Sequence, residues 1–328
     1  ANTCGVGTTA INRPRCSYPC FFERRSHRRR FRGLATFSKS RNTSAFVGTG
    51  ISYPSGVRCV GSLFMLDPHV IRGVCVLCGV GPVTDEHAYP HWVAEIVTKM
   101  MAERTPFTVV RTGTPDRESD IINVVVRRVC HPCNTRWLND IETEARPVLA
   151  PLITAAVGSH FVLSRNDREL LGLWAFKTAL MLDFTFDTPL IPARWYSAFR
   201  GLRRPSLGSV VWVAGYGGEE HAVFARRQPI RVDPTTAPGV LVNAYEGLGQ
   251  PDRPNGVITT FQAGRVVFQM LALFALPAIK LGSSTFDPLT IRTWPLTDKD
   301  GPVAWPAGGA LVLTDGSLIQ LADRLDLI

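Results

Sequence analysis

The chain lacks a long hydrophobic run. Its longest apolar stretch, over residues 266–279, is interrupted by Gln269 and Pro277, whereas a membrane-spanning helix needs roughly 18 consecutive apolar residues. Apolar residues nevertheless make up 45% of the 328 residues. This is enough for one large or two moderate domains with their own cores. The composition therefore predicts a globular protein with no membrane span.

Phosphate-binding glycine motifs are also absent. The sequence has no Walker-type loop and no convincing dinucleotide-binding pattern, so we expect no nucleotide cofactor. We also find no internal repeat.

Acidic residues are almost missing from the first part of the chain. Residues 1–64 hold eleven lysines and arginines and a single acid, Glu23, whereas residues 65–328 hold 25 bases and 26 acids. The first segment fits a disordered basic arm, a transit peptide, or a reading frame extended upstream of Met65. We assign it no function. Any affinity of residues 65–328 for nucleic acid must come from local basic patches.

Four of the eight cysteines form two Cys-x-x-Cys pairs, Cys75 with Cys78 and Cys130 with Cys133. Each pair places two thiolates on one tight turn, and two such turns together supply the four sulfur ligands that zinc prefers. The other four cysteines all precede residue 65. We therefore expect a metal site rather than disulfides, in a reducing compartment.

Residues 65–152 have the pattern of a small unit built around these cysteines. Apolar spacing predicts a helix over 91–104, and β-rich segments at 107–110 and 121–129 predict strands. A second helix is expected after Cys133. Together these elements predict a ββα unit wrapped around a metal ion.

The start and end of that second helix follow from its flanking residues. Asn134 or Thr135 is expected to cap it, and Pro147 and Pro151 are expected to close the region.

The pattern of apolar residues and turn signals in residues 153–328 predicts a second α+β region, whose role is unknown. A long helix is expected over 165–184, because apolar residues recur there every three or four positions. Asn255-Gly256 and Ala263-Gly264 predict hairpin turns. The expected strands cover residues 209–214, 221–225, 240–243, 256–262 and 266–272.

The motifs of residues 65–152 follow one another in a recognisable order. Glu86-His87 follows the first cysteine pair, Asn134 follows the second, and Trp137 and Glu142 lie in the next helix. This order resembles that of HNH endonucleases of the ββα-metal, or His-Me finger, superfamily, in particular their four-cysteine zinc branch from bacteria and phages. Three later segments look like the region often attached to such domains: 173–179, 294–295 and 305–306.

The resemblance implies roles for individual residues. His87 would be the general base, and Glu86 and Asn134 would hold a catalytic Mg²⁺ or Mn²⁺. The four cysteines would hold a structural zinc ion. A neutral imidazole is a competent base near pH 7, and a hard cation stabilises charge on the leaving oxygen. The resemblance also implies DNA as the partner and a cytoplasmic, bacterial or phage-encoded protein.

The chain departs from the family in the helix after Asn134, which offers no histidine. Asp140 and Glu142 are its nearest acids, and we expect one of them to face the site. The candidates for contact with nucleic acid are His91, Arg136 and Lys177. His91 either contacts phosphate or caps its helix. Lys177 either contacts phosphate or packs its stem at the edge of the core, with its ammonium group in solvent.

These patterns favour a metal-dependent DNA endonuclease with an α+β fold, in which a zinc-bound HNH domain over 65–152 is followed by a region with a long helix and antiparallel strands. The main alternative is a catalytically inactive, zinc-stabilised nucleic-acid-binding protein. A protein–protein adaptor that uses the C-terminal sheet would need neither Glu86-His87 nor Asn134. The endonuclease and the inactive binding protein differ in whether Glu86, His87 and Asn134 converge on one point near the zinc.

Overall fold

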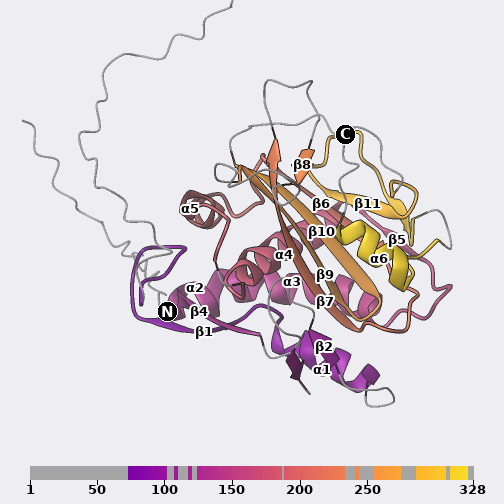
Figure 1. Ribbon diagram of the computed structural model, residues 1–328, viewed down its shortest axis with the longest axis horizontal. Helices are drawn as coiled ribbons and strands as arrows, with labels where there is room; N and C mark the ends of the chain where they lie inside the picture. Colours follow the sequence, from indigo (N-terminus) through magenta and orange to yellow (C-terminus); the bar gives the residue numbers. More distant parts are fainter. Residues whose placement is uncertain are drawn as a thin grey trace, which may run out of the picture. The chain divides into compact units, whose positions relative to one another are not determined.

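The computed structural model (Figure 1) describes residues 73–101, 107–109, 117–119, 124–186, 188–232, 241–243, 254–274, 286–307 and 311–323. They all belong to one compact unit, Gly61–Ile328. The expectations for residues 1–64 lie outside the described residues. Helices and antiparallel sheets are mixed in the described part, so the α+β class is confirmed. The domain boundary near residue 152 stays a prediction.

The elements near the cysteine pairs come first along the chain. They are β1 (Val83–His87), α1 (His91–Met101), β2 (Phe107–Val109), β3 (Arg117–Ser119), β4 (Val125–Cys130), α2 (His131–Cys133), η1 (Asn134–Leu138) and α3 (Asn139–Ile153). The remaining elements are β5 (Phe161–Leu163), α4 (Arg165–Asp183), α5 (Ala193–Leu202), β6 (Ser209–Gly215), β7 (Val223–Val232), β8 (Leu241–Asn243), β9 (Gly256–Ala263), β10 (Val266–Leu273), β11 (Thr290–Trp294), β12 (Val303–Trp305) and α6 (Asp315–Ala322).

β1 and β4 form a two-stranded antiparallel sheet that contains a bulge. The ladder pairs Thr84 with Val129 and then Glu86 with Val126, so the single residue Asp85 of β1 lies opposite two residues of β4, Arg127 and Arg128. The extra residue is therefore in β4, where Val126 and Val129 are both buried. Along β1 the side chains alternate between the two faces, so that Asp85 is exposed while Glu86 is buried.

The helical segment after β4 differs from the sequence prediction at both ends. It begins at His131 with Pro132 in its first turn, a position that suits proline because its missing N–H would have no helical partner. Asn134 therefore lies inside the helical segment and does not cap it. Pro147 lies inside α3, where the buried apolar side of the helix continues past it. Packing thus outweighs the helix-breaking tendency of proline.

The long helix α4 is confirmed and is the central element of the core. Ser164 forms a capping box with Asp167, in which each side chain bonds the backbone N–H of the other residue. Gly172 allows close approach to β11, because a Cβ there would lie 2.9 Å from the carbonyl oxygen of Thr293. Although α4 is largely buried, none of the described helices is long and apolar enough to span a membrane.

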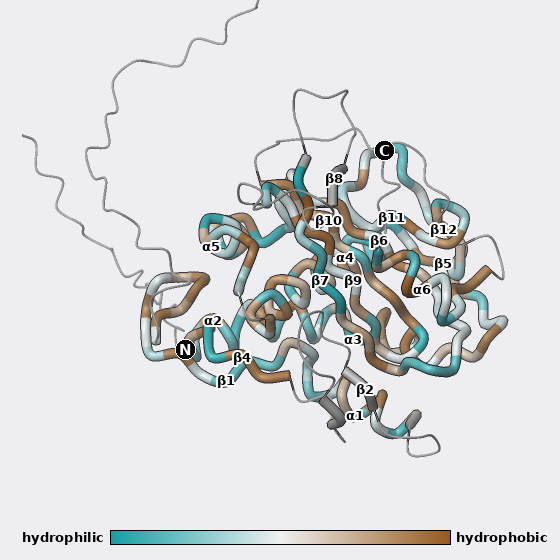
Figure 2. Tube along the Cα trace, in the orientation of Figure 1, coloured by the Kyte–Doolittle hydropathy of each residue, from teal (hydrophilic) through white to brown (hydrophobic). Residues whose placement is uncertain are grey.

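The main sheet has six antiparallel strands in the order β11-β6-β10-β9-β7-β8. Helices cover both of its faces (Figure 1). Phe268 and neighbouring residues pack with Trp174 of α4, whereas Val267 and Phe224 pack with Leu318 of α6. Because both faces are covered, β9 and β10 are buried along their whole length. Figure 2 shows the resulting hydrophobic colouring in the middle of the sheet.

One of the two predicted hairpin turns is present. Gly264 has a φ of +57° and joins β9 to β10, which pair along their length. The turn predicted at Asn255-Gly256 is wrong, because Gly256 is the first residue of β9 and β8 pairs with β7 instead. β8 and β9 are consecutive strands along the chain, but the long strand β7 lies between them in the sheet.

A buried carboxylate fastens the end of α4. Asp183 has no exposed surface and accepts hydrogen bonds from the backbone N–H groups of Leu190 and Ile191 and from the Tyr196 hydroxyl. Arg227 of β7 completes the set with an ion pair of 2.7 Å. One carboxylate therefore connects α4, the following loop, α5 and the sheet.

We expect Asp183→Ala to lower the free energy of unfolding by about 3–5 kcal/mol, because it leaves the largely buried Arg227 without its counter-charge. Urea denaturation followed by circular dichroism measures this. The control is Asp298→Ala, because the Asp298 side chain is fully exposed. Equal stability of the two variants would contradict the prediction.

Candidate metal centre and active site

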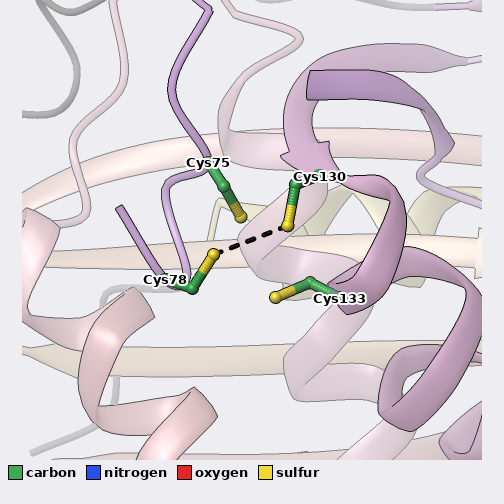
Figure 3. Close-up of side chains that lie close together, drawn as sticks. All are labelled: Cys75, Cys78, Cys130 and Cys133. Atoms are coloured by element: carbon green, nitrogen blue, oxygen red, sulfur yellow. Dashed lines mark hydrogen bonds between the residues drawn. The ribbon is translucent and has the colours of Figure 1, made fainter. Parts of the chain in front are cut away.

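The four cysteines of the two pairs come together in space. Cys75 and Cys78 lie in the loop before β1, Cys130 ends β4, and Cys133 ends α2 (Figure 3). Their sulfur atoms all lie within 4.8 Å of one another, and those of Cys78 and Cys130 are 3.5 Å apart. None of the four forms a disulfide.

Backbone hydrogen bonds shape the first cysteine turn and attach it to the second. The N–H of Gly79 donates to the carbonyl of Cys75 over 2.8 Å, and Gly79 has a φ of +73°, which favours glycine. The N–H of Val76 donates to the carbonyl of Arg128 in β4, also over 2.8 Å. The two turns are therefore held together independently of a metal ion.

The four sulfurs could hold a metal ion such as zinc. In a tetrahedral zinc site with Zn–S bonds of about 2.3 Å, neighbouring sulfurs lie about 3.8 Å apart, close to the spacing found here. Burial, together with the nearby Cys75, raises the pKa of the Cys133 thiol to about 12. A bound cation would reverse this effect by stabilising the thiolates. The donor set is therefore suited to a buried divalent ion.

The structure separates Glu86 from His87. Directly opposed residues of an antiparallel ladder share a face of the sheet, and Glu86 is opposite the buried Val126, whereas His87 is opposite Val125, which is 38% exposed. The Glu86 side chain therefore points into the protein and that of His87 toward the outer face. Asp85, not Glu86, is the exposed acid beside His87.

Asn134 links the second cysteine turn to β1. Its amide nitrogen donates to the backbone carbonyl of Asp85 over 3.0 Å and to the Thr84 hydroxyl over 3.5 Å. Both bonds use Nδ2, and none of the hydrogen bonds among the described residues uses the amide oxygen Oδ1. Asn134 thus lies next to the strand end that carries His87, and its amide oxygen remains as an acceptor.

Lys177 is buried beneath this strand. Its ammonium nitrogen lies 2.6 Å from carboxylate oxygens of both Glu86 and Glu142 and 3.2 Å from the carbonyl oxygen of His87. The Lys177 side chain has no exposed surface, so the prediction that its ammonium group reaches solvent is wrong. Its burial also removes it from the surface that a phosphate would contact.

The charges of this cluster explain the pKa shifts of its members. Burial raises the pKa of Glu86, against the lowering effect of Lys177, and Glu142 raises it further. Burial alone would lower the pKa of Lys177, but the two carboxylates outweigh burial and raise it. The two acids thus share a single buried cation.

The remaining predicted site residues lie on the surface. His91 begins α1 and pairs with Glu95 over 3.2 Å, with both side chains more than half exposed. Arg136 and Asp140 are exposed. Of the two candidate acids in the helical segment, Glu142 is the one that turns inward, and it contacts Lys177.

Basic and aromatic side chains are the types that contact nucleic acids, but several of those between residues 195 and 227 have structural roles. Arg226 pairs with Asp323, and Arg227 pairs with Asp183. Trp195, Tyr196 and Trp212 are buried, so they are core residues rather than stacking platforms. An exposed basic cluster is formed by Arg200, Arg203 and Arg204.

A second group of ligand-type side chains was not predicted from the sequence. Glu220, His221 and Asp315 lie within 4.8 Å of one another. The carboxylate of Asp315, however, already accepts the Tyr216 hydroxyl and the N–H groups of Glu219 and Glu220. Asp315 therefore connects the loop around Glu219 and Glu220 to the start of α6 by hydrogen bonds. No sequence pattern joins residues so far apart along the chain.

We expect Cys78→Ser to lower the zinc content by about one ion per chain, because the tetrahedral site loses one thiolate. Elemental analysis after gel filtration measures the content. His131→Ala is the matched control, since His131 lies between Cys130 and Cys133 but outside the sulfur cluster. Zinc contents that are equal in both variants and the unsubstituted chain would contradict a four-cysteine site.

Comparison of the chain with protein-family models, with curated proteins and with solved structures gave no match. The functional assignment therefore rests on the residues and contacts described above.

Proposed function

We propose that this chain is a metal-dependent endonuclease of the HNH type that hydrolyses phosphodiester bonds in DNA. The arrangement of elements supports the proposal. A cysteine turn precedes β1, which ends at His87, and β1 pairs with β4, which leads into a second cysteine turn and a helical segment. With α1, β2 and β3 inserted between the two paired strands, this is the arrangement that we would expect of a ββα-metal unit. The four sulfurs would hold a structural zinc ion at its base, closed to substrate.

The observation that carries the proposal is the bond from Asn134 to the carbonyl of Asp85. Asn134 directly follows the zinc-site residue Cys133, and Asp85 lies two residues before His87. The bond therefore fixes the end of β1 against the metal-binding turn. A zinc ribbon that served only as a structural support would not need this connection to a histidine-bearing strand.

In this proposal His87 takes the proton from the attacking water on the outer face of β1. Its partial exposure lets substrate reach it, and a neutral imidazole is suited to this task near pH 7. A bound Mg²⁺ or Mn²⁺ would supply positive charge beside the scissile phosphate. The oxygen donors that fit such an ion are the carboxylate of Asp85 and Oδ1 of Asn134.

Glu86 has a different role from the one that the sequence indicates. Its carboxylate is bound by Lys177 on the inner face, so Asp85 replaces it as the acid beside His87. Asp85 itself pairs with Arg127 over 2.6 Å, with both side chains exposed. Exposed ion pairs of this kind are weak and exchange readily with other partners, so an incoming cation can displace Arg127.

The ion pair of Asp85 also favours the second candidate, an inactive nucleic-acid-binding protein. Both acids next to His87 have basic partners, Arg127 for Asp85 and Lys177 for Glu86. If Arg127 holds Asp85 in the presence of divalent ions, the site keeps its basic surface and lacks a metal ligand. Binding of DNA without cleavage would then be observed.

We expect the full chain to nick plasmid DNA in Mg²⁺ or Mn²⁺, and His87→Ala to lower the rate by about 100-fold or more, because the general base is lost. His160→Ala is the control, since His160 is exposed and lies outside the site. Both variants must keep their zinc. Equal rates for the two variants would contradict His87 as the base, and binding without cleavage by the unsubstituted chain would favour the second candidate.

Asp85→Asn should raise the Mg²⁺ concentration needed for half-maximal cleavage by about tenfold or more, because an amide is a weaker ligand for a hard cation than a carboxylate. Titration of the nicking rate with Mg²⁺ measures this. Asp140→Asn is the matched control, since Asp140 is exposed on the adjacent helix. An unchanged Mg²⁺ requirement for Asp85→Asn would remove Asp85 from the metal site.

A further inference from the structure

The ammonium group of Lys177 has one acceptor for each of its three N–H groups. Two are the carboxylates of Glu86 and Glu142, each at 2.6 Å, and the third is the backbone carbonyl of His87 at 3.2 Å. Lysine can donate three hydrogen bonds, so its capacity is filled. These acceptors come from β1 and α3, while Lys177 belongs to α4. One buried group therefore joins three elements.

Both polar groups of the peptide bond between His87 and Ala88 form hydrogen bonds. Its carbonyl oxygen accepts from Lys177, and its N–H, that of Ala88, donates to the carbonyl of Val124 over 2.8 Å. Fixing this peptide plane fixes the backbone at His87. The direction of the bond from Cα to the imidazole is thereby set from inside the protein, although the imidazole itself lies on the outer face.

Stability alone does not account for this cluster. Burying two carboxylates and one ammonium group has a large desolvation cost, and apolar side chains of similar size often serve stability equally well. Apolar side chains would not, however, bond the His87 carbonyl. The feature that only the lysine supplies is the hydrogen bond to the backbone of the catalytic strand.

We propose that Lys177 is a positioning residue for His87. It acts through the His87 carbonyl, and Glu86 and Glu142 hold its ammonium group in place. The proposal rests on the proposed nuclease function. It also makes α4, which lies outside the predicted HNH domain, a necessary part of the active site.

The test separates positioning from stability. Lys177→Met alone leaves two buried carboxylates without a cation and should destabilise the protein. The triple variant Lys177→Met/Glu86→Leu/Glu142→Leu replaces the whole cluster with apolar side chains, so its melting temperature should recover. Lys99→Met is the matched control, because Lys99 is exposed on α1.

In the triple variant we expect kcat for DNA cleavage to fall by about 10- to 100-fold with KM nearly unchanged, because small displacements of a catalytic group lower the rate strongly. Hydrogen exchange of the Ala88 amide should be about tenfold faster, since the carbonyl of the same peptide group has lost its donor. Lys99→Met should match the unsubstituted protein in both measurements.

A triple variant with the stability and the kcat of the unsubstituted chain would overturn the proposal, because the cluster would then be only structural. Unchanged exchange of the Ala88 amide in that variant would likewise show that Lys177 does not hold this peptide group. If the unsubstituted chain does not cleave DNA, the nuclease proposal fails by itself. The rate of hydrogen exchange at the Ala88 amide in the triple variant then still decides whether Lys177 holds this peptide group.

Discussion

A lysine ammonium group without exposed surface must find an acceptor for every N–H group, and this requirement organises the region around His87. Lys177 meets it with two carboxylates and one backbone carbonyl. A single buried cation could not remain charged without such partners. Because the partners lie on β1 and α3, the arrangement of these elements relative to α4 is set by the same few contacts.

The strand end that carries His87 is thus held from two directions. From the inside, Lys177 binds the carbonyl of His87. From the side of the cysteine cluster, Asn134 binds the carbonyl of Asp85. Asn134 directly follows Cys133, one of the four clustered cysteines, so a metal ion bound by these cysteines would also restrain Asn134. Two separate restraints on one short strand suit a site in which a side chain must keep its orientation.

The six-stranded sheet supplies the rigid body behind α4. Helices cover both faces, and the buried carboxylate of Asp183 links the end of α4 to Arg227 of the sheet. A close-packed interior resists small displacements. The position of Lys177 beneath β1 therefore depends on a core much larger than the cysteine-bearing region.

The sequence by itself determined the features that depend on local spacing. These are the two cysteine pairs, the long helix α4 with its apolar periodicity, the turn at Gly264, and all or part of every strand of the main sheet except β11. It did not reveal that Glu86 rather than Asp85 faces the core, because the alternation along a strand places neighbouring acids on opposite faces without deciding which face is buried. The partners of Lys177 were also hidden. Its acceptors lie 35 or more residues away along the chain, and only the packing of α3 and α4 against β1 decides that this lysine is buried rather than exposed.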